Sequence, residues 1–289
     1  MTEPTRKPTT VPAIREMKGK RRIGMITAYD FPSARLVDEA GADIALVGDS
    51  LGMVVLGYLD TLNVTMEDML HHTRAAARGT KHALLVADMP YLSYHVSIEE
   101  TVRNAGAFIQ AGAHAVKVEG GKPSRIRAIE AILDAEIPVM GHIGLTPQSV
   151  NAIGGFKVQG KGKEAARRLI DEAVALDQAG CFSLVLECVP SEVAAFITEQ
   201  ISIPTIGIGA GPACDGQVLV FHDLLGLYDG HTPKFVRQYA DIGARSREAL
   251  AHYLDDVREG RFPDIGTESF HVSGEAELKR LYATVEEEK

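Results

Sequence analysis

The feature that most constrains this chain is the alternation of short, almost wholly apolar runs with longer amphipathic segments. Eight runs rich in aliphatic and β-branched residues are spaced along it, at 23–28, 44–47, 84–87, 115–118, 139–142, 184–186, 205–208 and 218–221. Strands buried on both faces of a parallel sheet have this uninterrupted apolar character. The segments 66–78, 97–110, 124–135, 163–178 and 191–200 have the apolar periodicity of helices that cover a sheet. The pattern therefore predicts repeated strand–helix units.

Eight such units predict an α/β protein of one domain, a (βα)8 TIM barrel. The alternative is an open doubly wound sheet, which usually has a glycine-rich phosphate loop after its first strand. Residues 28–31 are Ala-Tyr-Asp-Phe, which is no such loop. The connection 209–216 is short, so we expect a turn there in place of a barrel helix. A long segment, 234–258, follows the last strand, and we expect it to extend beyond the barrel and form an oligomer contact.

Composition excludes several classes of protein. Hydrophobic residues make up 45% and charged residues 24%, which is ordinary for a globular domain. No run approaches the ~18 apolar residues of a membrane span, and a net charge of −9 disfavours a nucleic-acid partner. The three cysteines, Cys181, Cys188 and Cys214, lack zinc-site spacing and are too few for a disulfide framework. A reduced, cytoplasmic location is the expectation.

The two ends of the chain differ from the rest. We expect residues 1–10 to form a disordered leader, residues 11–262 the barrel, and residues 263–289 a charged tail. No apolar core follows the basic residues of the leader, so it does not resemble a secretory signal. Pro4, Pro8 and Pro12 would break the helix of a mitochondrial presequence.

Acidic residues follow most of the predicted strands. The strands end, in chain order, at Asp30, Asp49, Asp88, Glu119, His142 and Glu187. The carboxyl ends of barrel strands meet at one mouth, where like charges repel unless they are neutralised. Oxygen ligands suit Mg²⁺ better than Zn²⁺. The pattern therefore predicts a magnesium site with Asp49 and Asp88 as direct ligands, and with Glu119 binding directly or through water.

Each of these carboxylates has a plainer interpretation, because an acidic residue after a strand often caps the next helix. Helix capping gives no reason for carboxylates to follow five different strands. The set as a whole therefore favours a common functional site. Asp30 is the weakest member, because it precedes Phe31-Pro32-Ser33 and could simply cap that helix.

Three further residues near the strand ends are candidates for binding and catalysis. Lys117 lies two residues before Glu119, so both side chains point to the same side of the strand. It could hold an anionic substrate group or form a salt bridge inside the barrel. Glu187 follows the apolar run 184–186, where desolvation would raise its pKa and suit a general base. His142 could donate a hydrogen bond to a substrate oxygen or be a structural histidine.

Two glycine motifs compete with this interpretation. Gly48-Asp49-Ser50-Leu51-Gly52 matches the G-x-S-x-G pattern and the GDSL signature of certain serine esterases. That elbow needs a helix directly after the serine, whereas residues 53–57 are mostly aliphatic and β-branched. The Asp68-x-x-His71 match lies too early in the chain for that family. The run 207–211 lacks the G-x-G-x-x-G spacing, and could bind an anion or form a tight turn.

Taken together, these motifs resemble the 3-methyl-2-oxobutanoate (ketopantoate) hydroxymethyltransferase family over residues 11–262. The resemblance runs through Thr27-Ala28-Tyr29-Asp30, residues 47–54, Val116-Lys117-Val118-Glu119-Gly120-Gly121 and residues 141–149. It continues through Leu186-Glu187-Cys188-Val189-Pro190, residues 206–211, Cys214-Asp215-Gly216-Gln217 and Phe221-His222-Asp223. One departure is the run Thr267-Glu268-Ser269-Phe270, where the family more often has a histidine before Ser-Phe; this change puts the packing of the tail in doubt.

The resemblance implies a Mg²⁺-dependent (βα)8 barrel, commonly decameric. It implies metal ligation by Asp49, Asp88 and Glu119, and binding of the 2-oxo acid by Asp49, Ser50, Asp88 and Lys117. It also implies that Glu187 is the catalytic base. In the implied reaction, 5,10-methylenetetrahydrofolate donates a one-carbon unit to 3-methyl-2-oxobutanoate, giving 2-dehydropantoate in pantothenate biosynthesis. The implied partners are these small molecules and further copies of the chain, with no nucleic acid and no membrane.

Two alternatives of different kinds remain. A Mg²⁺-dependent carbon–carbon lyase of the phosphoenolpyruvate mutase and isocitrate lyase type would share the barrel, but its Lys-Lys-Cys-Gly-His-like loop is absent from this sequence. An inactive barrel used as a scaffold would not need the acidic strand ends. The segment 151–163, rich in Gly and Lys, could cover the mouth of the site.

Overall fold

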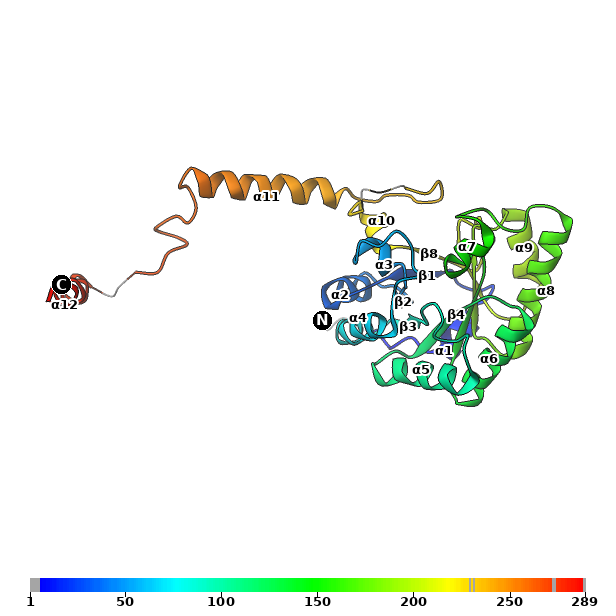
Figure 1. Ribbon diagram of the computed structural model, residues 1–289. Helices are drawn as coiled ribbons and strands as arrows, with labels where there is room; N and C mark the ends of the chain where they lie inside the picture. Colours follow the sequence, from blue (N-terminus) through cyan, green and yellow to red (C-terminus); the bar gives the residue numbers. More distant parts are fainter. Residues whose placement is uncertain (1–5, 229, 231, 272–273, 288–289) are drawn as a thin grey trace. The chain divides into compact units, whose positions relative to one another are not determined.

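Eight parallel strands close into a barrel in the computed structural model, which describes residues 6–228, 230, 232–271 and 274–287 (Figure 1). The strands are β1 (Ile23–Thr27), β2 (Ile44–Val47), β3 (Leu84–Asp88), β4 (Ala115–Glu119), β5 (Val139–Gly144), β6 (Ser183–Glu187), β7 (Thr205–Ile208) and β8 (Gly216–Leu219). Each strand pairs with the next along the chain, and β8 pairs with β1. The predicted (βα)8 barrel is therefore confirmed.

The predicted strands agree with the observed ones to within one or two residues at most ends. The largest shift is in the last strand, which was expected at 218–221 and runs instead over Gly216–Leu219. Phe221 opens the short helix α10 (Phe221–Leu225), and its N–H donates to Oγ1 of Thr27, 2.8 Å away. The apolar run continued past the strand, so the sequence pattern alone could not show where pairing stops.

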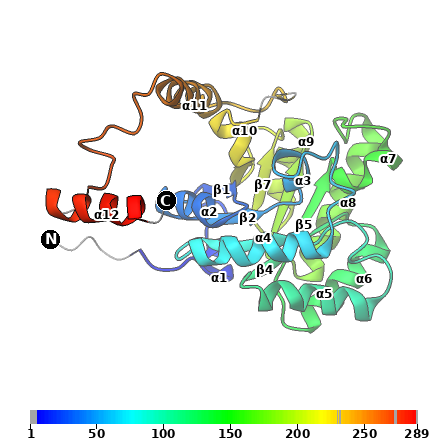
Figure 2. The same cartoon turned by 60° about the vertical axis from the view of Figure 1, so that its left-hand side comes forward.

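Helices pack outside the strands, as Figure 2 shows for α4, α5, α6 and α8. The covering helices are α2 (Phe31–Glu39), α4 (Met66–Gly79), α5 (Ile98–Gln110), α6 (Pro123–Asp134), α8 (Lys163–Ala179) and α9 (Ser191–Gln200). Side chains at the N-caps hold several helix starts; Thr65, for example, accepts from the N–H of Asp68. Residues 209–215, all described, contain no helix, so the predicted reduction to a turn is confirmed.

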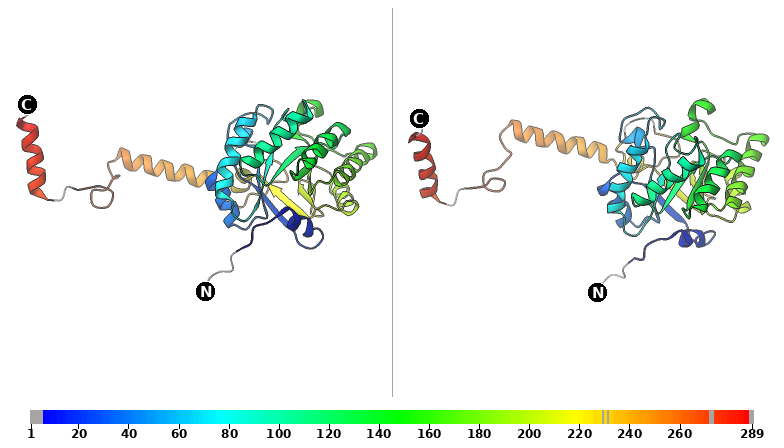
Figure 3. Two further views of the ribbon diagram at one scale, coloured as in Figure 1. Left: turned by 90° about the horizontal axis from the view of Figure 1, so that it is seen from below. Right: turned by 60° about the horizontal axis from the view of Figure 1, so that its bottom comes forward.

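The apolar core has two parts. One lies between the strands and the outer helices, and includes Leu85, Phe108 and Ile129. The other fills the barrel interior and includes Met25 and Ile14. Ile14 belongs to α1 (Val11–Glu16), which lies against one end of the barrel (Figure 3). Side chains therefore fill that end of the barrel.

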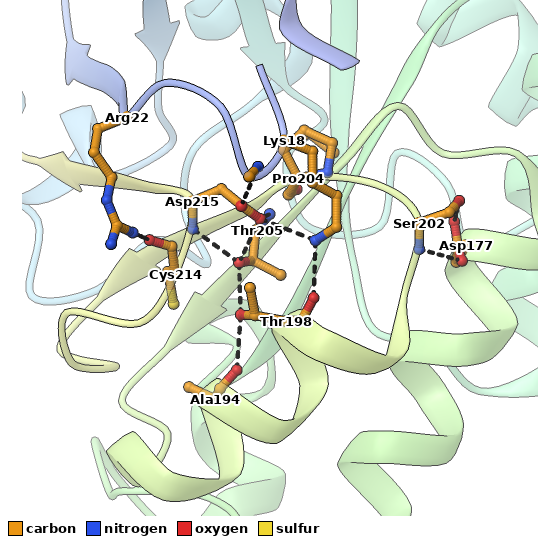
Figure 4. Close-up of polar contacts among 12 residues, drawn as sticks. Lys18, Arg22, Asp177, Ala194, Thr198, Ser202, Pro204, Thr205, Cys214 and Asp215 are labelled. Carbon is orange, nitrogen blue, oxygen red and sulfur yellow. Dashed lines mark hydrogen bonds and ion pairs between the residues drawn. The ribbon is translucent and has the colours of Figure 1, made fainter. Parts of the chain in front are cut away.

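A polar network ties the N-terminal end of the barrel together (Figure 4). Asp215, just before β8, accepts hydrogen bonds from Lys18 Nζ at 3.0 Å, from the N–H of Gly19 at 3.0 Å and from the N–H of Thr205 at 2.9 Å. Burial favours the neutral acid, but these hydrogen bonds and the Lys18 charge hold the pKa of Asp215 below its usual value. The network therefore links the N-terminal segment to the starts of β7 and β8.

The chain divides into two compact units, Met1–Ala240 and Asp241–Lys289. The first contains all eight strands. The second contains α11 (Ile242–Arg258) and α12 (Glu275–Glu287). Within the long segment 234–258, the helix α11 begins at Ile242, and Asp241 caps it by accepting from the N–H of Ala244 at 3.0 Å. No described helix is long and apolar enough to cross a membrane. The oligomer contact expected of this segment stays a prediction.

The predicted leader is only partly described. Residues 1–5 lie outside the described residues, while 6–10 contain no helix or strand. Within 6–10, the N–H of Thr9 donates to the carbonyl of His82 at 2.6 Å, and Arg6 Nη1 donates to the carbonyl of Asp38 at 3.0 Å. The division into leader, barrel and tail stays a prediction.

Candidate active site

A cavity of about 540 Å³ lies at the carboxyl ends of the strands. Seven of the residues that the sequence analysis singled out line it: Asp49, Ser50, Asp88, Lys117, Glu119, His142 and Glu187. The register of the strands explains the grouping, because β3 pairs Asp88 with Lys117 and β4 pairs Glu119 with His142. The structure therefore brings the predicted set together.

Three carboxylates share the buried part of this cavity. Asp49, Asp88 and Glu119 are 4%, 3% and 5% exposed, and the N–H of Asp49 donates to Oδ2 of Asp88 at 3.0 Å. Burial, together with the charges of Asp88 and Glu119, raises the pKa of Asp49 well above its ordinary value. Burial also raises the pKa of Asp88, although Lys117 opposes it. This concentration of negative charge favours a cation.

Lys117 is the cation that the chain itself supplies. Its Nζ lies 2.9 Å from Oδ1 of Asp88 and 3.1 Å from Nδ1 of His142. Burial alone would lower the pKa of Lys117, but the charges of Asp88, Glu119 and Asp49 raise it above its usual value. The side chain therefore stays an ammonium group inside the barrel, where it can bind an anion.

His142 lies between two glutamates. Its Nε2 is 3.2 Å from Oε2 of Glu187, and its Nδ1 is 3.5 Å from Oε1 of Glu119. Burial and the Lys117 charge both lower the pKa of His142, but the two glutamates outweigh them and raise it to about 9. The histidine thus links Glu187 to the buried carboxylates. Glu187 ends β6 with 17% of its side chain exposed, so the desolvation expected for it is partial.

Asp30 does not belong to this group. Its side chain is exposed and does not line the cavity; it caps α2, accepting from the N–H of Ser33 at 2.8 Å. Ser33 in turn accepts from the N–H of Asp30, completing a capping box. Including Asp30 among the mouth carboxylates was wrong, because its carboxylate accepts a hydrogen bond from a backbone N–H in the first turn of α2.

Ser50 makes no arrangement typical of a serine esterase. The expectation that no helix follows it was wrong, since the four-residue helix α3 (Leu51–Val54) begins at the next residue. However, its hydroxyl lies 2.9 Å from Oη of Tyr29, which is not a base for a nucleophile. Asp68 and His71 lie on α4, where Asp68 accepts from the N–H of Thr65. The hydrolase alternative therefore gains no geometric support.

The sequence analysis missed three residues of the site. Gln148 donates from Nε2 to Oδ2 of Asp49 at 2.8 Å, and Tyr94 donates to the Gln148 side chain. Asp223 lines the cavity, and burial raises its pKa. A search for titratable or metal-binding residues at strand ends overlooks Gln148, whose only signal was its place in the motif after β5.

The outer part of the cavity is mostly apolar. Phe156, Lys157 and Val158 line it, so part of the segment 151–163 does border the cavity, as expected. On another side it is lined by Lys234 and Phe235. The run 207–211 serves here as a turn: Gly209 has φ +64°, and a Cβ there would come within 2.7 Å of the Phe235 ring. A side chain at 209 would therefore displace Phe235.

The donor set is suited to a hard divalent cation. The described residues contain no group of three His, Cys, Asp or Glu side chains already gathered about one metal position. Nevertheless, Asp88 Oδ1 and Glu119 Oε1 are buried, and each faces a basic side chain: Lys117 Nζ lies 2.9 Å from Asp88 Oδ1, and His142 Nδ1 lies 3.5 Å from Glu119 Oε1. Buried carboxylate oxygens of this kind suit Mg²⁺, which prefers carboxylate ligands and retains several waters. The magnesium site at Asp49, Asp88 and Glu119 stays a prediction.

A (βα)8 barrel with carboxylates, a buried lysine and a histidine around one cavity defines a barrel enzyme that handles a small anionic molecule. The family Ketopantoate hydroxymethyltransferase matches residues 8–265, and the chain belongs to that family. A relative from Syntrophomonas wolfei, named 3-methyl-2-oxobutanoate hydroxymethyltransferase, is 59% identical over 92% of this chain and 95% of its own length. One of the same name from Clostridium botulinum is 56% identical over 94% and 99%.

Solved structures with the same fold are much more distant in sequence. A phosphoenolpyruvate phosphomutase from Streptomyces platensis has a TM-score of 0.58 at 15% identity, covering 96% of this chain and 97% of its own. A 2,3-dimethylmalate lyase has a TM-score of 0.52 at 16% identity, with 96% and 99% covered. At these identities the likeness establishes the barrel fold and nothing about the reaction.

Proposed function

We propose that this protein is a 3-methyl-2-oxobutanoate hydroxymethyltransferase, acting in pantothenate biosynthesis. It would transfer a one-carbon unit from 5,10-methylenetetrahydrofolate to 3-methyl-2-oxobutanoate, giving 2-dehydropantoate. The observation that carries the proposal is the convergence of Lys117, Glu187 and the carboxylates Asp49, Asp88 and Glu119 on one cavity, in a chain more than half identical to relatives of that name.

Asp49, Asp88 and Glu119 would hold Mg²⁺. When bound, the ion supplies Lewis-acid stabilisation of the charge that develops on the oxygen of the 2-oxo group. The buried ammonium of Lys117 and the hydroxyl of Ser50 line the same cavity and would anchor the substrate carboxylate or oxygen. These groups orient carbon three of the oxo acid toward the base.

Glu187 would remove the proton from carbon three. His142, 3.2 Å from Oε2 of Glu187, restricts the orientation of that carboxylate. Water hydrolyses the methylene bridge of the folate: both C–N bonds to the methylene carbon break, tetrahydrofolate leaves with two new N–H bonds, and the carbon keeps the water oxygen at the formaldehyde level. The carbon nucleophile forms its bond to that carbon, and the proton held by Glu187 goes to the oxygen, which becomes the new hydroxyl group. The apolar residues of the lining suit the neutral rings of a folate, and the two lysines, Lys157 and Lys234, suit the carboxylates of its glutamate tail.

The same family membership supports a cytoplasmic protein, a homodecamer, and partners restricted to small molecules and copies of this chain. We also carry forward the division of the chain into a leader at 1–10, a barrel at 11–262 and a tail at 263–289. The lyase alternative draws support only from the shared barrel, which many unrelated reactions use.

The test is an assay of the purified full-length chain with 3-methyl-2-oxobutanoate and 5,10-methylenetetrahydrofolate. We expect 2-dehydropantoate, detected by mass spectrometry, to form with Mg²⁺ and to disappear with EDTA. A parallel reaction without folate tests the lyase alternative, which would break a carbon–carbon bond of a suitable oxo acid unaided. Absence of 2-dehydropantoate under saturating Mg²⁺ would contradict the proposal.

A further inference from the structure

Gln148 connects the loops that follow four strands of the barrel. It lies in the short 3-10 helix η1 (Pro147–Ser149) after β5, and is 6% exposed. Its Nε2 donates to Oδ2 of Asp49 at 2.8 Å and to the carbonyl of Met89 at 3.0 Å. Its backbone N–H donates to Oε2 of Glu119 at 3.1 Å. One residue therefore contacts two of the three carboxylates in the buried part of the cavity.

Tyr94 holds the Gln148 amide in this orientation. Its hydroxyl donates to Oε1 of Gln148, so Nε2 must face Asp49. The Tyr94 oxygen also lies 3.4 Å from the N–H of Glu119. The amide therefore cannot turn over without breaking several contacts.

Arg125 completes the support. Its guanidinium carbon lies 4.3 Å from the centre of the Tyr94 ring, and Nη1 donates to the Tyr94 carbonyl at 3.0 Å. Its Nε donates to the Glu119 carbonyl at 2.8 Å. A stacked arginine with two such bonds is rigid, so both partners of Gln148 are held by packing as well as by hydrogen bonds.

Gln148 binds only one of the two oxygens in each of the carboxylates Asp49 and Glu119. Each uses one oxygen, Oδ2 of Asp49 or Oε2 of Glu119, and the other oxygen receives no hydrogen bond from Gln148. For Glu119 that second oxygen, Oε1, is also buried, and His142 Nδ1 lies 3.5 Å from it. Partners that fix one oxygen of a carboxylate commonly orient the other toward a metal.

We infer that Gln148 is a positioning residue that holds one oxygen each of Asp49 and Glu119, so that their remaining oxygens are set for a divalent cation before substrate binds. The inference rests on the proposed function, in which these carboxylates bind Mg²⁺. Gln148 itself touches neither substrate nor metal in this arrangement. Its effect is to lower the reorganisation that cation binding would otherwise require.

The test measures Mn²⁺ binding to the full-length protein without substrate, from the electron paramagnetic resonance signal of free Mn²⁺. The variant Gln148→Met removes the amide without adding charge, and we expect the Mn²⁺ dissociation constant to rise by about 10–100-fold. Tyr94→Phe keeps Gln148 but frees its amide, and should raise the constant by less than about tenfold. Gln110→Met and Tyr91→Phe, matched changes at exposed positions, should leave it unchanged.

Steady-state kinetics and unfolding separate positioning from a general loss of structure. We expect Gln148→Met to raise the KM for Mg²⁺ and for the oxo acid more than it lowers kcat at saturation, with thermal unfolding in EDTA close to wild type. Mn²⁺ affinity unchanged in Gln148→Met would overturn the role of Gln148 while leaving the proposed function intact. Wild-type protein that binds no Mn²⁺ would overturn both. If Gln148→Met fails to fold, Tyr94→Phe decides: affinity equal to that of Tyr91→Phe would overturn the inference.

Discussion

The ammonium nitrogen of Lys117 lies 2.9 Å from Oδ1 of Asp88, and both side chains are buried. The two residues face each other across the register of β3 and β4. Water reaches neither group freely, so each charge depends on the other and on the groups around the cavity. A buried pair of this kind is strongly destabilising when only one partner is removed.

We therefore expect Lys117→Met to lower the free energy of unfolding of the metal-free protein by about 3 kcal/mol, because three carboxylates would lose their internal cation. Urea denaturation followed by circular dichroism measures this. Lys81→Met, at an exposed position, is the control and should change stability little. Equal effects of the two substitutions would mean that the Lys117–Asp88 pair is not stabilising.

Glu187→Gln should slow the chemical step while sparing substrate binding. The amide can still accept from His142, but it cannot take the proton from carbon three, so kcat should fall by about 10²–10⁴. Hydrogen–deuterium exchange at carbon three of the oxo acid, followed by NMR with Mg²⁺, isolates that step. Asp223→Asn removes another acid of the same cavity and should leave exchange intact. Fast exchange in Glu187→Gln, or its loss in Asp223→Asn, would move the base elsewhere.

Asp49→Asn should separate stability from metal binding. The raised pKa of Asp49 means that stability is greatest below the ordinary carboxyl pKa and is lost as the pH rises through the folded-state value. At neutral pH, above the ordinary carboxyl pKa, Asp49 therefore lowers the stability of the metal-free fold, and Asn should raise that stability by about 1 kcal/mol.

Wild type should gain about 2.7 kcal/mol from Mg²⁺ at 100 times its dissociation constant, whereas Asp49→Asn should gain almost nothing. Thermal unfolding with and without Mg²⁺ gives both quantities. A full Mg²⁺ response in the variant would exclude Asp49 as a ligand.

Asp215→Asn should weaken the N-terminal end of the barrel in a pH-dependent way. Because the pKa of Asp215 is depressed on folding, its stabilisation is present above the unfolded value of about 3.9 and is lost as the pH falls through the folded one. We expect a loss of about 2 kcal/mol at pH 7, shrinking as the acid is titrated.

The comparison is with Asp177→Asn. The two oxygens of Asp177 accept hydrogen bonds from Ser202 at 2.7 and 2.8 Å, also drawn in Figure 4, and Asn keeps only one accepting oxygen. Urea titrations of both variants at several pH values give the free energies. A loss of unfolding free energy in Asp215→Asn that does not change with pH would show that the negative charge of Asp215 does not stabilise the barrel.

Asp30→Ala should cost about 1 kcal/mol of stability, the usual effect of removing an N-cap, and leave kcat/KM unchanged. Thermal unfolding and steady-state kinetics on the same preparation check both parts. Ser33→Ala removes the reciprocal half of the capping box and should behave alike. A large loss of activity in Asp30→Ala alone would return Asp30 to the site.

The grouping of the site carboxylates could largely be predicted, because parallel barrel strands all end at the same rim. Buried strands must be apolar, and the residues that end them all reach the same rim, so Asp88, Glu119 and Glu187 were recognisable by position and charge. Asp30 satisfied the same rule and was wrongly included, because capping and ligation use the same side chain. Gln148 carries no charge and follows no repeat, so no rule of pattern selects it.

The sequence by itself determined the number and order of the strands, because burial on both faces leaves a local signature in residue type. It also determined which carboxylates could meet, since strand order sets which ends are neighbours. Only the tertiary structure decided which oxygen of each carboxylate is bound and which remains unbound. Those contacts join residues as far apart in the sequence as Asp49 and Gln148. Differences of a few tenths of an ångström decide whether such a hydrogen bond forms, and no local sequence pattern encodes them.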